Sequence, residues 1–324
     1  MIKVQKYNSS QKSNWNNFVK KSKNGTFLFE RDFIEYHSNR FIDYSLMIYD
    51  KKELLAIFPA NLNKKTEVVS HSGLTYGGLV ISERMKLNTY LSVFKNILFF
   101  LNQNGISILN YKSIPIFYIR LPSQEEEYAF FLLKAELTRV DTTLAIKNDT
   151  KISYQKRRER SIKEADNFDF RIDKDGDFKV FWEKILTPNL ETRFGKEPVH
   201  TLEEIELLKT KFPKNIHQIN IFQADEIVAG CTIFETHLVA HAQYIAANDF
   251  GRKSGILDKL FDYLITELFV EKAFFNFGIC NEDAGRYINQ GLLDWKESFG
   301  GRTSTHKFYS INTAKYHLLD TVLI

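Results

Sequence analysis

The sequence predicts an α/β fold of two similar domains, each a mostly antiparallel mixed sheet flanked by helices. The chain has 324 residues, of which 44% are hydrophobic, which suits two domains of ~150 residues each. Strand-like and helix-like segments follow one another along the chain, and one order of segments occurs twice. A repeat of ~170 residues is too long for a solenoid and indicates two copies of one domain.

Each copy has the order hairpin, strand, glycine segment, helix, strand. The hairpins are recognised by short apolar runs on either side of a polar turn. In the first copy the segments are 45–58, 68–71, 73–78, a helix with apolar residues Leu91, Phe94, Leu98 and Leu101, and 107–111. In the second copy they are 219–233, 238–248, 251–255, 256–265 and 273–278.

Polar turn residues at Asp149–Lys151 mark the predicted boundary, which gives domains of residues 1–149 and 150–324. They precede the predicted helix Lys151–Ala165, the most basic stretch of the chain. A solvated helix face with Glu/Lys pairs at helical spacing explains such a stretch. The alternative is a phosphate contact by Arg157 or Arg158, and both interpretations stay open.

Composition excludes several classes of function. The net charge of +4 slightly favours a polyanionic small molecule and gives no argument for nucleic acid. Apolar runs such as Ile97–Leu101 are far shorter than the ~20 residues of a membrane span, and the N-terminus lacks a signal-peptide core. We therefore expect a cytoplasmic protein without a membrane partner. Cys231 and Cys280 have no zinc spacing, so no metal is expected.

A possible anion site lies where the strand 238–248 runs through Arg252-Lys-Ser-Gly255 into a helix. Free backbone N–H groups, the positive end of the helix dipole and a guanidinium would together suit a pyrophosphate. An ordinary surface turn before an amphipathic helix is the alternative interpretation. The residues expected to bind the cofactor are Ala246, Asn248, Arg252, Lys253, Ser254, Gly255 and Asn289.

This order of strand, loop, helix and strand resembles the coenzyme A corner of the GNAT acyltransferase superfamily. Leu257 stands where that superfamily has a small residue. The segments 276–285, 289–292 and 295–302 resemble the C-terminal signature of the FemAB-like, double-GNAT branch, in which Asp is common at the place of Asn276. The resemblance implies two GNAT-like domains and acyl-CoA as cosubstrate, bound by the second domain.

The first glycine segment contains Tyr76 but no basic residue, so the first domain is expected to bind another ligand. Arg on phosphate, Tyr on a base and Asp on hydroxyls would suit a sugar nucleotide. The candidates are Tyr36, His37, Arg40, Asp43, His71 and Tyr76, together with Arg193. N-caps and surface polar residues are the alternative explanation for each of them.

Two GNAT-like halves with one coenzyme A site resemble cytoplasmic N-acyltransferases of nucleotide-linked amino sugars, which act in surface-polysaccharide synthesis such as that of the lipopolysaccharide O-antigen. The type suggested moves a 3-hydroxybutanoyl group to dTDP-3-amino-3,6-dideoxygalactose. Two alternatives remain. One is a FemAB-like peptidoglycan aminoacyltransferase that uses aminoacyl-tRNA, and the other is a non-catalytic GNAT pair. Oligomeric state is not predicted.

The reaction needs a base, because an ammonium must lose a proton before it attacks a thioester. The candidates are His241, His71, Glu282 and Asp283, and proton loss through a water chain is the alternative. Regular alternation along the strand would place His241, Gln243 and Ile245 on one side of the sheet and Ala242, Tyr244 and Ala246 on the other. Backbone N–H groups near Ala246–Asn248 would bind the oxyanion.

Overall fold

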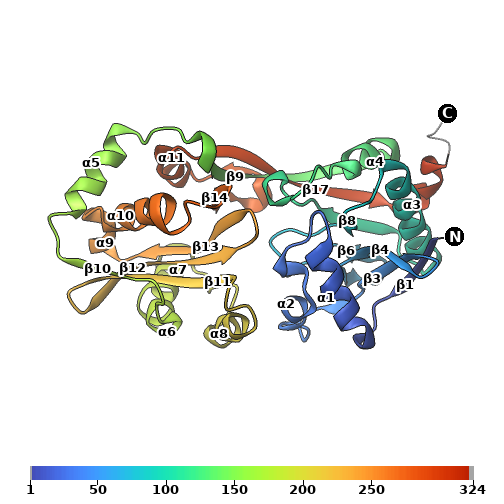
Figure 1. The fold of residues 1–324 in the computed structure, drawn as a ribbon, viewed down its shortest axis with the longest axis horizontal. Coiled ribbons are helices and arrows are strands. Elements are labelled where there is room, and N and C mark those ends of the chain that lie inside the picture. Colours follow the sequence, from blue (N-terminus) through green and yellow to red (C-terminus); the bar gives the residue numbers. More distant parts are fainter. Residues whose placement is uncertain (1, 321–324) are drawn as a thin grey trace. The chain divides into compact units, whose positions relative to one another are not determined.

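A computed structural model describes residues 2–320, apart from the side chain of Phe194. The chain divides into two compact units, and each combines sheet and helix as the sequence predicts (Figure 1). The first unit comprises residues 1–141 and 305–324, and the second comprises 142–304.

The first unit contains two groups of strands. One is an antiparallel sheet in the order β1 (Ile2–Lys6), β3 (Leu46–Asp50), β4 (Glu53–Phe58), β7 (Val80–Ile81). The other has the order β17 (Arg302–Asn312), β8 (Ile108–Lys112), β6 (Glu67–Val69), β5 (Asn61–Lys64), β2 (Ile42–Asp43). Its helices are α1 (Lys12–Lys21), α2 (Arg31–Glu35), α3 (Leu87–Gln103) and α4 (Glu125–Leu133). The predicted apolar face of α3 is buried in the core of this unit.

The second unit has strands in the order β10 (Phe170–Asp173), β11 (Ile216–Gln223), β12 (Glu226–Glu235), β13 (Val239–Ala247), β14 (Phe274–Ile279), β9 (Glu136–Lys147). Only β13 and β14 run parallel in this order. The helices are α5 (Lys156–Ala165), α6 (Phe178–Phe181), α7 (Thr187–Phe194), α8 (Leu202–Lys211), α9 (Asp249–Lys253), α10 (Ile256–Tyr263) and α11 (Gln290–Ser298). Helices α10 and α11 lie on one face of the sheet, and α6 and α8 lie on the other (Figure 1). A small hairpin of β15 (Asn281–Glu282) and β16 (Tyr287–Ile288) precedes α11.

These units differ in two segments from the division at residue 149 that the sequence predicts. Residues 142–149 belong to the second unit, because β9 pairs with β14 from Thr143 to Lys147. The C-terminal residues from Thr305 belong to the first unit, because Phe308–Asn312 of β17 pair with β8.

Helix α5 begins five residues later than the sequence predicts. The Gln155 backbone N–H donates to Ser298 O at 2.9 Å, and Gly300 lies close against Ile152 O. Residues 151–155 are therefore held against the end of α11 in a non-helical conformation. Packing against α11 overrides the helical pattern of charges there.

The glycine segment of the first unit is fixed by two residues of β8. The Lys112 ammonium donates to the carbonyl oxygens of His71, Ser72 and Leu74 at 2.8–3.1 Å. Tyr111 Oη accepts from the Leu79 N–H at 2.7 Å and donates to Glu126 Oε2 at 2.6 Å. Burial of the Glu126 carboxyl raises its pKa to about 7.

We expect Glu126→Gln to remove a pH dependence of stability. The pKa of Glu126 is higher in the folded protein than in the unfolded chain. The stabilising effect of Glu126 is therefore complete below pH ~4.5 and is lost as the pH rises to about 7. Glutamine imitates the protonated acid and still accepts from Tyr111. The free energy of unfolding of the variant should therefore be higher than that of the parent by on the order of 1–2 kcal/mol at pH 8, and equal to it near pH 5. Urea unfolding at both pH values measures this.

Glu127→Gln is the matched control, because Glu127 is the next residue and its carboxylate pairs with Lys307 at 2.7 Å. This variant should keep most of the fall in stability between pH 5 and 8. An unchanged pH dependence in Glu126→Gln would show that Glu126 is ionised in the folded protein at neutral pH.

Candidate functional site

The parallel strands β13 and β14 form a fork in the second unit. They pair at three positions, Val239 with Phe274, Ala240 with Phe275, and His241 with Asn276. Beyond that point β13 continues to Ala247 without pairing to β14. Strand β14 bends at Gly278, where φ is +74°, and pairs again with β9 at Ile279. His241 and Asn276 therefore stand where the two strands separate.

Asn276 holds the ring of His241 in one tautomer. The Asn276 amide nitrogen donates to Thr143 Oγ1 at 2.8 Å and to Leu144 O at 3.0 Å. Its oxygen accepts from the Gly278 N–H at 3.1 Å and lies 2.6 Å from His241 Nδ1. Because that oxygen can only accept, His241 Nδ1 carries the proton and Nε2 carries the lone pair.

Burial keeps this imidazole neutral. His241 is 9% exposed, and desolvation lowers its pKa to about 4, although the hydrogen bond to Asn276 opposes the shift. At neutral pH the ring therefore has a nitrogen that can accept a proton. This is the arrangement required of a base or of a hydrogen-bond acceptor for an amine.

A bulge at Gln243 changes the side of the sheet to which the later β13 residues belong. Thr232 of β12 pairs with Tyr244 and Ile233 pairs with Ala242, so Gln243 is an extra residue on β13. Ala242 and Ile245 both pack against the core cluster that contains α10. Tyr244 instead contacts the rings of Trp182 and His200. The regular alternation expected from the sequence is therefore wrong beyond Ala242.

Arg252 fixes the end of β13. Its guanidinium donates to Asn189 Oδ1 at 3.0 Å and also to the Ala247 carbonyl and the Asp249 carboxylate. Asn248 caps α9 by accepting from the Gly251 N–H at 2.8 Å. Arg252, Lys253 and Arg193 together hold the pKa of the exposed Asp249 below its ordinary value. Three cations thus gather at the end of β13 around one carboxylate.

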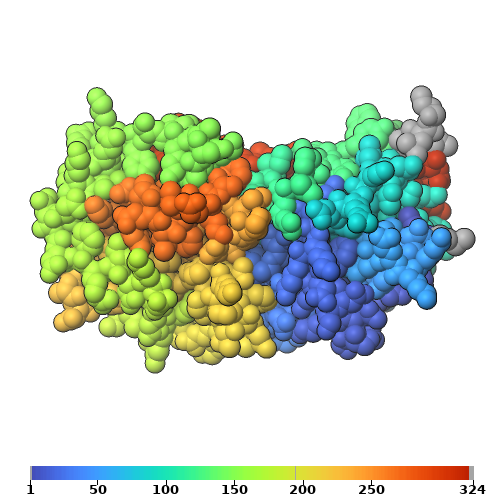
Figure 2. All heavy atoms as spheres, in the orientation of Figure 1, coloured from blue at the N-terminus to red at the C-terminus, as the bar shows by residue number. Residues whose placement is uncertain are grey.

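Gly255 is used for packing against α5. Its φ is +78°, and a Cβ there would lie 2.1 Å from Ser161 O. The neighbouring Asp258 pairs with Arg158, accepts from Ser161 Oγ at 2.6 Å, and accepts from Trp295 Nε1 at 2.8 Å. In Figure 2 the light green segment that contains α5 lies against the orange segment that contains α10. Helix α5 therefore fills the side of the loop expected to face a pyrophosphate.

Other expected residues of the second unit have local structural partners. Ser254 is buried, and its hydroxyl donates to Phe250 O at 2.8 Å. Asn289 caps α11 by accepting from the Leu292 N–H at 3.0 Å, and its amide donates to Glu282 Oε1 at 3.0 Å. Glu282 is the last residue of β15, Asp283 begins the turn that leads to β16, and both are exposed. Leu257 lies in α10 and packs against the core of the second unit, which explains its size.

In the first unit, four of the expected substrate residues lie together. The ring of His37 is 4.1 Å from that of Tyr36 and 5.3 Å from that of His71. The Arg40 guanidinium lies 5.7 Å from the Tyr36 ring. Desolvation, with help from His37 and Lys112, lowers the pKa of His71 to about 3.

Two residues of the expected set, Tyr76 and Asp43, have partners within the first unit. Tyr76 is 1% exposed, donates to Thr26 Oγ1 at 2.8 Å, and contacts Phe29 and Tyr118, so it cannot offer its face to a base in this conformation. Asp43 pairs with Arg31 at 2.6 Å. The sequence reveals neither partner, because both are distant along the chain or in another element.

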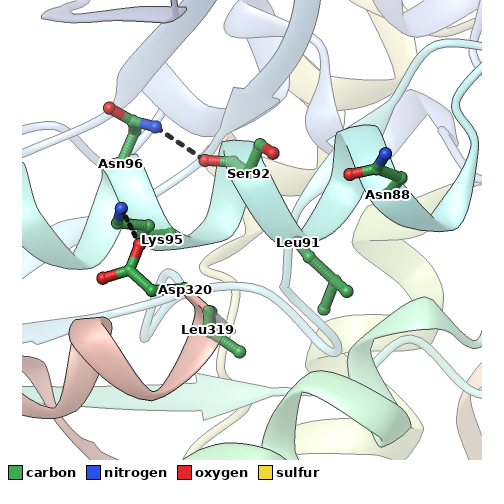
Figure 3. A pocket seen from close by; sticks show the side chains of 7 residues that line it. All are labelled: Asn88, Leu91, Ser92, Lys95, Asn96, Leu319 and Asp320. Atoms are coloured by element: carbon green, nitrogen blue, oxygen red, sulfur yellow. Dashed lines mark hydrogen bonds and ion pairs between the residues drawn. The ribbon is translucent and has the colours of Figure 1, made fainter. Parts of the chain in front are cut away.

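The first unit also has a cavity of about 170 Å³ on α3 (Figure 3). It is lined by Asn88, Leu91, Ser92, Lys95, Asn96, Leu319 and Asp320. Lys95 and Asp320 pair with each other, and none of the residues expected to bind or react lines this cavity. Within residues 2–320, no three His, Cys, Asp or Glu side chains gather as metal ligands. No helix in that range is long and apolar enough to cross a membrane.

Comparison with known proteins identifies the fold. No family model matches the sequence, and no curated protein is similar to it. Among solved structures, FemX superposes with a TM-score of 0.66 at 10% identity, over 98% of this chain and 99% of that one. The L-PGS structure from Bacillus licheniformis superposes with a TM-score of 0.61 at 12% identity, over 97% of this chain and 96% of that one. A tandem GNAT protein from the clavulanic acid biosynthesis pathway superposes with a TM-score of 0.54 at 8% identity, over 97% of this chain and 99% of that one.

The chain has a tandem GNAT-like fold. This confirms the fold predicted from the sequence. At such low identity the likeness concerns the fold alone.

Sequence reasoning missed Lys296 of α11, which is 2% exposed and donates to two backbone carbonyls of the fork. A signal was present, because Lys296 lies three residues from both Leu293 and Phe299 and therefore on the apolar face of its helix. It also missed Asn189, which binds Ala247 O at 2.9 Å.

We expect Gly255→Ala to destabilise the second unit through its contact with α5. Gly105→Ala is the matched control, because Gly105 has φ of +77° and nothing within 4 Å of the added methyl group. The free energy of unfolding of the control should fall by about 1 kcal/mol because of backbone strain. Gly255→Ala should lose at least ~2 kcal/mol more, because the methyl group meets a backbone oxygen. Equal losses in urea unfolding would mean that α5 moves away from the loop without cost.

Proposed function

We propose that this protein is an N-acyltransferase that moves an acyl group from acyl-CoA to a primary amine. The observation that carries the proposal is the fork, where a neutral imidazole with its proton fixed on Nδ1 stands beside a strand that has parted from its neighbour. The tandem GNAT-like fold supports it.

The chemistry assigned to the fork has two parts. The acceptor amine attacks the thioester carbonyl, and His241 Nε2 takes the proton that the nitrogen loses. Backbone N–H groups of β13 between Ala242 and Ala247 stabilise the oxyanion before the thiolate leaves. His241 thus serves as the base among the candidates from the sequence, with His71, Glu282 and Asp283 outside this role.

The three cations at the end of β13 would receive the phosphates of the donor. Arg193 and Lys253 are exposed, and Arg252 is partly so. Charge-assisted hydrogen bonds to phosphate are among the stronger polar contacts in proteins. Because α5 fills the Gly255 side of the loop, we assign the pyrophosphate to these side chains rather than to the N-terminus of α10.

For the acceptor we propose a nucleotide-linked amino sugar, bound by the first unit. The cluster of Tyr36, His37, Arg40 and His71 supplies an aromatic ring, imidazoles and a guanidinium. The resemblance of the sequence suggests dTDP-3-amino-3,6-dideoxygalactose, a 3-hydroxybutanoyl group and a cytoplasmic reaction that feeds surface-polysaccharide synthesis.

A second candidate is transfer from an aminoacyl-tRNA, the donor that the FemAB-like resemblance implies. The packing of α5 on Gly255 favours it, because a donor without coenzyme A needs no pyrophosphate cradle at that loop. Arg158 gives it no support, since its guanidinium is buried in the pair with Asp258.

A donor and acceptor assay distinguishes the two candidates. We expect acyl-CoA to support transfer to a nucleotide-linked amino sugar, and aminoacyl-tRNA to give no product above background. The free amino sugar should have kcat/KM at least ~100-fold lower, because the diphosphate supplies much of the binding energy. Transfer from aminoacyl-tRNA alone would establish the second candidate, and equal use of free and linked sugars would refute the proposed acceptor.

We expect His241→Gln to lower turnover by ~100-fold or more, because a neutral amide cannot take the proton. His237→Gln is the control, since His237 is exposed and only four residues away. His71→Gln, Glu282→Gln and Asp283→Asn should stay within a few-fold of the parent. In the parent, the step assigned to His241 should lose rate only as pH falls towards about 4. Near-parental turnover of the variants at all four candidate bases, with the His237 control set aside, would favour proton loss through water.

A further inference from the structure

Lys296 is a buried lysine whose partners are two carbonyl oxygens and the thiol of Cys280. It projects from α11 and is 2% exposed. Its ammonium donates to Gly278 O at 3.1 Å and to Ile279 O at 2.8 Å. Among residues 2–320, no carboxylate lies within ion-pair distance of it in the structure. A buried charge without a counterion is costly, so the burial of the Lys296 ammonium calls for a specific explanation.

The two carbonyls belong to the part of β14 that has left β13. Gly278 and Ile279 follow the last parallel pair, and the bulge that separates β14 from regular pairing with β9 lies between Asn276 and Ile279. Gly278 is half-buried, and Ile279, which pairs with Thr143 of β9, is 41% exposed, but neither carbonyl receives a donor from β13. The Lys296 ammonium provides a donor at both positions and thereby fixes the path of β14 away from β13.

Lys296 also acts on His241 through its charge. After burial and the opposing hydrogen bond to Asn276, the positive charge of Lys296 is the next influence on the pKa of His241, and it lowers that pKa. Around Lys296, the titratable groups are His241 from β13, Cys280 after β14, and Glu297 beside Cys280 on α11. Burial lowers the pKa of Lys296 itself to about 8, so it is mostly charged at neutral pH.

We propose that Lys296 is a positioning residue of the acyl-transfer site, which holds β14 apart from β13 through Gly278 and Ile279, with its positive charge acting alongside burial on the His241 ring. The proposal rests on the proposed function for its catalytic meaning. Its two physical parts, strand position and ring charge, are measurable without any turnover.

The variants separate hydrogen bonding from charge. Lys296→Gln keeps an amide with two N–H donors for the two carbonyls but removes the charge. Lys296→Met removes both. Lys272→Met is the matched control, because the Lys272 ammonium donates to Thr236 O at 3.0 Å and pairs with Glu235 near the closed end of the same strand pair. Lys296→Arg restores charge and donors if the other variants fold poorly.

The first measurement is a titration of the His241 ring nitrogens by NMR. We expect the pKa of His241 to rise in Lys296→Gln and Lys296→Met and to stay at the parental value in Lys272→Met. A pKa of His241 that is unchanged in both Lys296 variants would overturn the electrostatic part.

The second measurement is acyl-CoA kinetics. We expect KM for the donor to rise at least ~10-fold in Lys296→Met and less than ~3-fold in Lys296→Gln, because only the former loses the hold on β14. Equal donor KM values for both variants would overturn the positioning part. Failure of the parent to use acyl-CoA would refute the proposed function, and the NMR result would still decide whether Lys296 controls His241.

Discussion

The candidate site depends on one constraint, which is that buried backbone polar groups must find partners when a parallel strand pair ends inside a protein. Beyond His241 and Asn276 the strands β13 and β14 no longer pair with each other, so the carbonyls of Gly278 and Ile279 receive no hydrogen bond from β13. The Lys296 ammonium serves both. At the end of β13, Arg252 and Asn189 do the same for Ala247 O. The fork therefore stays open because side chains take the place of the missing strand.

This substitution of side chains for strand pairing connects stability with chemistry. An ammonium brought in to satisfy carbonyls also places a positive charge near the imidazole. An arginine that fixes the end of β13 also contributes to the cation cluster around Asp249. The same residues thus shape the backbone and set the electrostatics, which is why their two roles have to be separated by variants that alter one property at a time.

The sequence predicted those parts of the fold that depend on local pattern. The apolar period of α3 and the alternation in β13 before the bulge were sufficient to place those elements, and the position of His241 made it a candidate. Gln243 shows the first limit, because a bulge depends on the register with β12 rather than on the local sequence. Gly255 shows the second, since a glycine with positive φ looks the same in sequence whether it faces a phosphate or Ser161 O. The partners of Tyr76 and Asp43, which are Thr26 and Arg31, are recognisable only in three dimensions, so the sequence did not reveal these contacts.

Asn276 has a further consequence for the kind of catalyst this fork can be. An amide orients the ring of His241 as firmly as a carboxylate would, but it has no charge at any physiological pH. A carboxylate in its place would attract a second proton to the imidazole and couple the two ionisations. With Asn276 the orientation of the ring does not depend on the ionisation of its partner, while burial, the Asn276 hydrogen bond and the nearby ammonium together set the pKa of the ring. The imidazole is thus oriented by a group that does not itself titrate.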